Sequence, residues 1–155
     1  MEIVDKHMDD ILKSVGLRVH REKYDGLAHF GSVRVRLGYW NEKLSIEVIS
    51  AADLTPHDVP FKVFKCSEKT QPSSDPFVEL ELKPTTNFFN EQKYTTAVQW
   101  KNLNPIFNET FHWRISPDDC LIQPATLVIT VKDYDILTKN AFLGEALFPL
   151  HLVRY

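Results

Sequence analysis

From Ser32 onward, apolar and polar residues alternate along the chain in a series of short runs. Every second residue is apolar in runs at residues 33–37, 44–48, 78–82, 111–115, 127–131 and 143–150, and a further run at residues 93–100 carries Tyr94, Thr96 and Val98 on one face. Side chains at every second position of a strand point to one face, so each run predicts a strand with one buried face. Turn residues separate the runs and no helical pattern lies among them, which predicts an all-β antiparallel sandwich. Trp100 and Trp113 fall in these runs and are expected to be core or half-buried sheet residues.

Residues 1–16 show a different spacing, which is typical of a helix. Val4, Met8, Ile11 and Val15 lie three or four residues apart and would line one helix face. A single apolar face over so few turns is marginal in water. We therefore expect an N-terminal amphipathic helix that packs on its own domain or belongs to an upstream helical domain, with a dedicated binding helix as the alternative.

The chain has 155 residues, which is enough for one domain with a complete core. We assign residues 1–30 to the helix and a charged connector, and residues 31–155 to the domain. The formal net charge of -3 argues against a nucleic-acid binder that relies on a basic surface. Cys66 and Cys120 lie far apart without metal-ligand spacing, which fits a reducing, cytoplasmic setting. No apolar run is long enough to span a bilayer, so membrane contact is expected to be peripheral.

A long connection, residues 59–74, interrupts the regular succession of predicted strands. Long connections in compact domains tend to be functional or disordered. This one carries interleaved aromatic and basic residues, namely Phe61, Lys62, Phe64 and Lys65. Its apolar side chains would either pack back onto the sandwich or contact lipid, and the sequence leaves both possibilities open.

Two carboxylates one residue apart, Asp133 and Asp135, follow a predicted strand. Such a pair can present hard oxygen ligands on one side of a loop, which suits calcium because this ion takes about six to eight oxygens. Ile136 and Leu137 come next, where a solvated loop would normally be polar. The alternative is a polar turn that contains a chance pair of acids.

Five short motifs, in order along residues 31–153, resemble those of a C2 domain of the synaptotagmin-like kind. They are Ala51-Ala52-Asp53-Leu54 with the acid Asp58, Ser74-Asp75-Pro76-Phe77-Val78, Leu103-Asn104-Pro105-Ile106-Phe107-Asn108-Glu109-Thr110-Phe111, Asp133-Tyr134-Asp135, and Gly144-Glu145. With the upstream helix, the last two are most similar to the C-terminal C2 domain of the Unc-13 (Munc-type) vesicle-priming proteins, in the branch that acts in granule and dense-core-vesicle secretion. The resemblance implies an eight-stranded type of β-sandwich, with the last strand missing because the chain stops at Tyr155.

The resemblance also implies calcium bound between loops at one end of the sandwich. Carried over position by position, the expected ligands are Asp58, Asp75, Asp133, the carbonyl of Tyr134, Asp135 and Thr138. Two departures from the family pattern matter. The fifth acid of the family falls at Ala141, whose methyl group cannot ligate, and residues 59–74 lengthen the first loop. Because ligand number and charge tune calcium affinity, the missing acid should weaken or abolish at least one ion site.

The expected function is that of a calcium-dependent phospholipid-binding module, which brings a vesicle-priming or exocytosis protein to an anionic phospholipid membrane. The residues expected to contact lipid are Phe61, Lys62, Phe64, Lys65, Ile136 and Leu137. The alternative is a calcium-independent protein-interaction module with a degenerate ion site, whose partner would be a small GTPase or the fusion machinery. An enzyme is not expected, because the sequence lacks a nucleophile elbow, a phosphate-cradling loop and a zinc-protease motif. The expected location is cytoplasmic and peripheral to the membrane.

Overall fold

The computed structural model describes residues 31–57, 73–83, 93–116, 125–137 and 139–152, together with the backbone of residues 11–16. Within these residues the chain forms eight strands and one short 3-10 helix. They are β1 (Ile11–Gly16), β2 (Ser32–Trp40), β3 (Lys43–Ala52), β4 (Pro76–Lys83), β5 (Tyr94–Thr95), β6 (Ile106–Arg114), β7 (Thr126–Asp133), β8 (Ala141–Pro149) and η2 (Leu150–Leu152).

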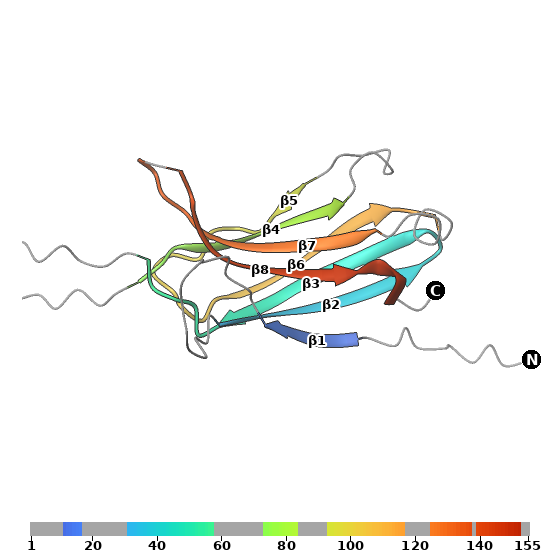
Figure 1. Ribbon diagram of the computed structural model, residues 1–155, viewed down its shortest axis with the longest axis horizontal. Coiled ribbons are helices and arrows are strands. Elements are labelled where there is room, and N and C mark those ends of the chain that lie inside the picture. The colour runs from blue at the N-terminus through green and yellow to red at the C-terminus, as the bar shows by residue number, and fades with distance from the viewer. Residues whose placement is uncertain are drawn as a thin grey trace, which may run out of the picture.

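The strands form two four-stranded sheets that lie one on the other. The strand order is β1-β2-β3-β6 in one sheet and β5-β4-β7-β8 in the other, and every neighbouring pair is antiparallel. Figure 1 shows the sheets as two stacked layers. The predicted all-β antiparallel sandwich is therefore confirmed.

The core lies between the sheets and is filled by the alternating apolar residues that predict the strands. Side chains at most 4% exposed include Val33, Val35, Leu37, Leu44, Ile46, Val48, Val78, Leu80, Leu82, Leu127, Ile129 and Val131. These residues come from every second position of β2, β3, β4 and β7, because successive side chains of a strand point to opposite faces. Full burial of one such side chain is worth about 1.5–3 kcal/mol, so these positions supply the main favourable term in folding.

An aromatic contact joins β5 and β6, which belong to different sheets. The rings of Tyr94 and Trp113 meet edge to face, with centroids 4.5 Å apart. The Tyr94 hydroxyl also donates a hydrogen bond of 2.7 Å to the carbonyl of His112. Trp113 is buried, as its place in a predicted strand indicates.

The strand predicted over residues 93–100 is shorter in the structure and includes only Tyr94 and Thr95. Thr96 forms two hydrogen bonds of 2.9 Å with the backbone of Val78, donating from its N–H and accepting at its hydroxyl. The hydroxyl replaces a strand carbonyl as the acceptor, and regular pairing ends there. Trp100 and Lys101 then form a turn. The prediction that Trp100 lies in the core or the sheet is wrong, because its side chain is 59% exposed.

The N-terminal helix expected over residues 1–16 is replaced by a strand in its second half. Residues Ile11–Gly16 form β1, which pairs with β2 from Ile11 opposite Leu37 to Gly16 opposite Ser32. Ile11 and Val15 are also separated by two strand periods, so their spacing fits both structures. The edge of β2 offers unpaired N–H and C=O groups with which an added strand can pair. A short helix without tertiary packing is only marginally stable, so the strand is favoured here. Val4 and Met8 lie outside the described residues.

The directions of the strands bring several connections to one end of the sandwich. β3 and β7 end there, whereas β4, β6 and β8 begin there, as the register of these strands and Figure 1 show. We call this part the loop end and define it as residues 53–57, 73–75, 96–105 and 133–140, with Thr138 not described. The turn between β2 and β3 lies at the opposite end (Figure 1).

That turn consists of Asn41 and Glu42, which follow Trp40 and precede its partner Lys43. Both residues have a positive φ, 49° at Asn41 and 58° at Glu42. Two left-handed residues are characteristic of a type I′ hairpin turn, whose twist matches that of the flanking strands. Asn tolerates this conformation, but Glu is strained in it because its Cβ approaches the following carbonyl.

We predict that Glu42→Gly stabilises the domain by about 0.5–1 kcal/mol. The substitution relieves about 1–2 kcal/mol of left-handed strain, and the greater freedom of glycine in the unfolded chain offsets part of this gain. The ion pair of Glu42 with Arg114 is long, 3.5 Å, and both side chains are exposed, so its loss matters little. Urea unfolding measures the change. Glu42→Ala is the matched control, which keeps the strain and should not stabilise; equal stability of the two variants would contradict the prediction.

Candidate functional site

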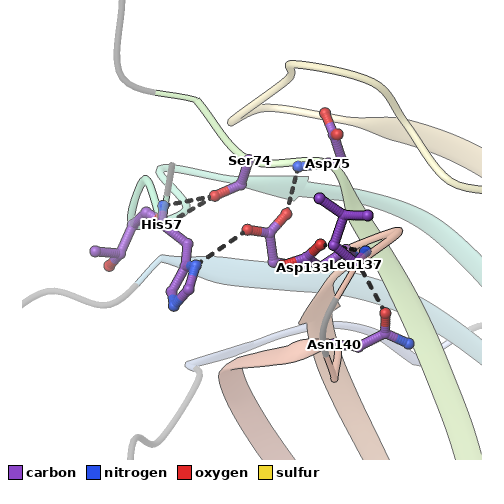
Figure 2. A network of polar contacts seen from close by, with 8 residues as sticks. His57, Ser74, Asp75, Asp133, Leu137 and Asn140 are labelled. Carbon is purple, nitrogen blue, oxygen red and sulfur yellow. Dashed lines mark hydrogen bonds and ion pairs between the residues drawn. The ribbon is translucent and has the colours of Figure 1, made fainter. Parts of the chain in front are cut away.

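Asp133 is the last residue of β7 and a buried acid at the loop end. The inward face of β7 carries Leu127, Ile129 and Val131, and the same alternation brings Asp133 to the interior, with 3% exposure. Its Oδ1 accepts a hydrogen bond of 2.6 Å from the N–H of Asp75, and its Oδ2 lies 3.5 Å from Nδ1 of His57. Figure 2 shows the Asp133 carboxylate between the His57 ring and the backbone nitrogen of Asp75.

Asp75 connects three segments of the loop end. Besides its N–H bond to Asp133, its carbonyl accepts the N–H of Tyr134 at 2.9 Å. Its carboxylate accepts the N–H of Lys101 at 2.6 Å and, as Figure 2 shows, points away from the Asp133 carboxylate. The residues before β4, the segment 96–105 and the segment after β7 are thereby held together by one residue.

The buried residue Ser74 extends this network to the first segment of the loop end. Its hydroxyl accepts the N–H of His57 at 2.8 Å and lies 3.3 Å from the carbonyl of Thr55, to which it donates. Its carbonyl accepts the N–H of Asn102 at 3.0 Å. These bonds place His57 beside Asp133, a contact that nothing in the local sequence pattern indicates.

Asp135 lies in the exposed turn between β7 and β8. Its Oδ1 accepts the N–H of Leu137 at 2.8 Å, the geometry of an Asx turn. Its own N–H donates to Oδ1 of Asn140 at 3.2 Å. Asn140 therefore closes the turn, a role that its position beside Ala141 does not reveal. Ala141 opens β8 opposite Asp133 and offers no side-chain oxygen.

The oxygen donors at the loop end are of the kind that a hard cation prefers. Asp75, Asp133 and Asp135 all lie there, as the sequence predicts. Within the part of the chain that the structure describes, however, no three side chains of His, Cys, Asp or Glu are grouped closely enough to hold a metal ion. The carboxylate of Asp75 instead accepts a backbone N–H, and that of Asp133 accepts a backbone N–H and lies beside His57. Asp58 and Thr138 lie outside the described residues, so their roles as ligands stay predictions.

Large apolar side chains are exposed at the same end. Ile136 is 75% and Leu137 is 91% exposed, in agreement with their predicted position at a loop tip. Trp100 lies with them, its ring edge-on to that of Tyr134 at a centroid distance of 5.7 Å. The other residues predicted to contact lipid, Phe61, Lys62, Phe64 and Lys65, lie outside the described residues. The part of the chain that the structure describes contains no helix with the length and apolar character of a membrane span.

The β4–β5–β7 surface carries a ladder of opposite charges. Lys132 forms an ion pair of 2.9 Å with Glu79. Glu81 forms ion pairs with both Lys93, at 3.2 Å, and Lys83, at 3.1 Å. Burial raises the pKa of Glu81, but hydrogen bonds and charge from Lys83 and Lys93 outweigh it, so that this pKa is lowered. The lysines of this surface are thus paired with acids rather than gathered into a basic patch.

The family follows from comparison with known proteins. Residues 42–154 match the model of the C2 domain, and the chain belongs to this family. It is 33% identical to protein unc-13 homolog D of Homo sapiens over 138 residues. This alignment covers 88% of the chain and 12% of that protein. It is 32% identical to BAI1-associated protein 3 of Mus musculus over 151 residues, and this alignment covers 96% of the chain and 12% of that protein. The predicted resemblance to the Unc-13 group is confirmed, although the chain spans only a small part of these relatives.

Solved C2 domains show the same fold. A C2 domain of RIM from Drosophila superposes with a TM-score of 0.63 at 20% identity, over 79% of this chain and 87% of that one. The third C2 domain of the KIAA1228 protein gives a TM-score of 0.61 at 21% identity, over 84% and 83% of the two chains. At these identities the likeness concerns the fold alone.

We predict that Asp133→Ala destabilises the domain by about 1–3 kcal/mol, because the N–H of Asp75 loses its acceptor in a poorly hydrated place. Asp133→Asn keeps an oxygen at the same position and should cost less than about 1 kcal/mol. Urea unfolding of the two variants measures the difference. Equal stability of both would show that the hydrogen bond contributes little.

We predict that Lys93→Met raises the pKa of Glu81, because it removes one of the two lysines that outweigh burial. A lowered folded-state pKa contributes stability that is present above the unfolded-state pKa and is lost as the pH falls through the folded-state pKa. The acid limb of the stability curve should therefore move to higher pH in this variant. Carboxyl NMR titration gives the pKa directly. Lys43→Met is the control, which should raise the pKa of His112 and leave Glu81 unchanged, since burial and then Lys43 lower that histidine's pKa.

Proposed function

We propose that this chain is a calcium-dependent phospholipid-binding C2 module that recruits a larger secretion protein to a membrane. The observation that carries the proposal is the combination at the loop end of acids with exposed Ile136 and Leu137. Membership of the C2 family and similarity to Unc-13 and synaptotagmin relatives support a role in membrane trafficking.

The residues that would hold calcium are Asp75, Asp133 and Asp135, with the carbonyl of Tyr134 and with Asp58 and Thr138. Calcium would supply the positive charge that lets anionic headgroups approach these carboxylates. Asp133 is prepared for such a role by burial, since little water screens its charge at 3% exposure. His57 Nδ1, 3.5 Å from its Oδ2, stands where a cation would compete for that oxygen.

Ile136 and Leu137 would add the apolar part of the interaction. Both project from the turn that Asp135 and Asn140 hold closed. Burial of apolar surface contributes about 25 cal/mol of favourable free energy per Å². Ile136 and Leu137 are 75% and 91% exposed in the free domain, so most of their apolar surface is still available for burial in a bilayer. The hydrogen-bonded turn reduces the entropy lost when these side chains become ordered.

We predict that Asp135→Asn lowers calcium affinity about tenfold or more and abolishes calcium-dependent sedimentation with anionic liposomes, because a charged ligand is lost. Asp135 is exposed, so the fold should survive. Isothermal titration with calcium and co-sedimentation in calcium or in chelator measure both effects. Asp53→Asn is the matched control at the same end, since Asn tolerates the positive φ of 54° there. Equal sedimentation of the unaltered chain in calcium and in chelator would contradict the proposal.

A second candidate is a calcium-independent protein-interaction module. Two observations favour it: Ala141 stands in place of an acid, and Asp133 is already engaged by His57 and the N–H of Asp75. In this case millimolar calcium gives no heat in titration, either alone or with anionic liposomes present, and a protein partner takes the place of the membrane.

A further inference from the structure

Trp100 is a large exposed side chain of the loop end, on a different segment from Ile136 and Leu137. It is 59% exposed and lies between the two residues Gln99 and Lys101, whose backbone is fixed. Gln99 donates its N–H to the carbonyl of Pro76 at 2.9 Å, and Lys101 donates its N–H to the carboxylate of Asp75 at 2.6 Å. Because hydrogen bonds hold the residues on both sides, Trp100 is presented outward by a rigid turn.

The ring of Trp100 does not pack into the core but against another exposed aromatic side chain. Its centroid lies 5.7 Å from that of Tyr134, at an interplanar angle of 88°. Tyr134 is itself 37% exposed and directly precedes Asp135, Ile136 and Leu137. Four large side chains from two segments are therefore exposed at one end of the sandwich. Clusters of this kind on a folded domain mark interaction surfaces.

We propose that Trp100, with the ring of Tyr134 perpendicular to its own, is an interfacial anchor that enters the headgroup region of a phospholipid bilayer. Trp and Tyr combine an apolar body with a polar N–H or O–H, and they concentrate at the boundary between lipid headgroups and hydrocarbon. The neighbouring Lys101 is exposed and carries the charge that anionic headgroups attract. The proposal rests on the proposed function, because it places a second segment of the same end in the same membrane.

The contribution of Trp100 is separable from that of the acids. Its indole contacts Tyr134. The Asp75 carboxylate accepts the backbone N–H of Lys101, and replacement of the Trp100 side chain by alanine leaves this backbone group in place. Removal of the indole should therefore weaken binding to vesicles without changing the heat of calcium binding. A residue that only supports the fold of the loop would change both.

The three tryptophans allow a direct test in the 155-residue chain. Trp113 is buried at 4% exposure, and Trp40 is 76% exposed but ends β2 beside the β2–β3 turn, away from the loop end. Vesicles of phosphatidylcholine and phosphatidylserine with calcium should shift the Trp100 emission of a Trp40→Phe variant to shorter wavelength. Bromine-labelled acyl chains should quench that emission. Trp100→Ala should weaken vesicle binding roughly tenfold, whereas Trp40→Ala should leave it unchanged.

The outcomes separate this proposal from the proposed function. Vesicle binding in calcium with no emission shift and no effect of Trp100→Ala overturns the anchor and leaves the proposed function standing. A loss of calcium heat in Trp100→Ala also overturns it, because the indole would then act through the acids. Absence of vesicle binding by the unaltered chain in calcium overturns both. An emission shift together with weaker binding of Trp100→Ala supports the anchor.

Discussion

The hydrogen bond from the Asp75 N–H to the Asp133 carboxylate is the contact on which the loop end depends. It continues the pairing of β4 with β7 by one step, using a side chain as acceptor where the backbone ladder ends at Pro76 opposite Asp133. Through the other groups of Asp75, the same point fixes Tyr134 and Lys101. The positions of the acids and of Trp100 therefore follow from one junction between the two central strands of a sheet, rather than from the loops separately.

At this junction the carboxylate of Asp133 is both a candidate cation ligand and part of the packed sheet. The inward alternation of β7 that buries Val131 also buries Asp133, so the sheet that stabilises the domain also removes a carboxylate from water. A buried carboxylate is costly unless hydrogen bonds or a positive charge compensate it. In this fold the N–H of Asp75 donates to Oδ1 of Asp133 and His57 Nδ1 lies 3.5 Å from Oδ2, and a bound cation would act on the same oxygens. Stability of the free domain and affinity for a cation are therefore opposed at Asp133.

The sandwich could be predicted from the sequence because local alternation alone decides which face of each strand is buried. The exposed tips Ile136 and Leu137 could be predicted as well, since apolar residues directly after an Asp-x-Asp pair are locally conspicuous. What failed depends on distant partners. Ile11–Gly16 fits a helix by spacing and becomes a strand only because β2 offers an edge. Trp100 fits a strand by spacing, but Thr96 ends the pairing through a contact with Val78. The His57–Asp133 contact likewise joins residues that only the folded chain brings together.

Exposed apolar side chains and an excess of acids occur together at the loop end. The described residues of the loop end carry four aspartates, Asp53, Asp75, Asp133 and Asp135, against two lysines, Lys101 and Lys139. In the proposed function, this excess of negative charge would oppose association of Trp100, Ile136 and Leu137 with an anionic bilayer, since like charges repel over about 10 Å at moderate ionic strength. Apolar burial can then take effect only where that charge is offset. In the proposed function, the acids decide when the surface binds and the apolar side chains decide how tightly.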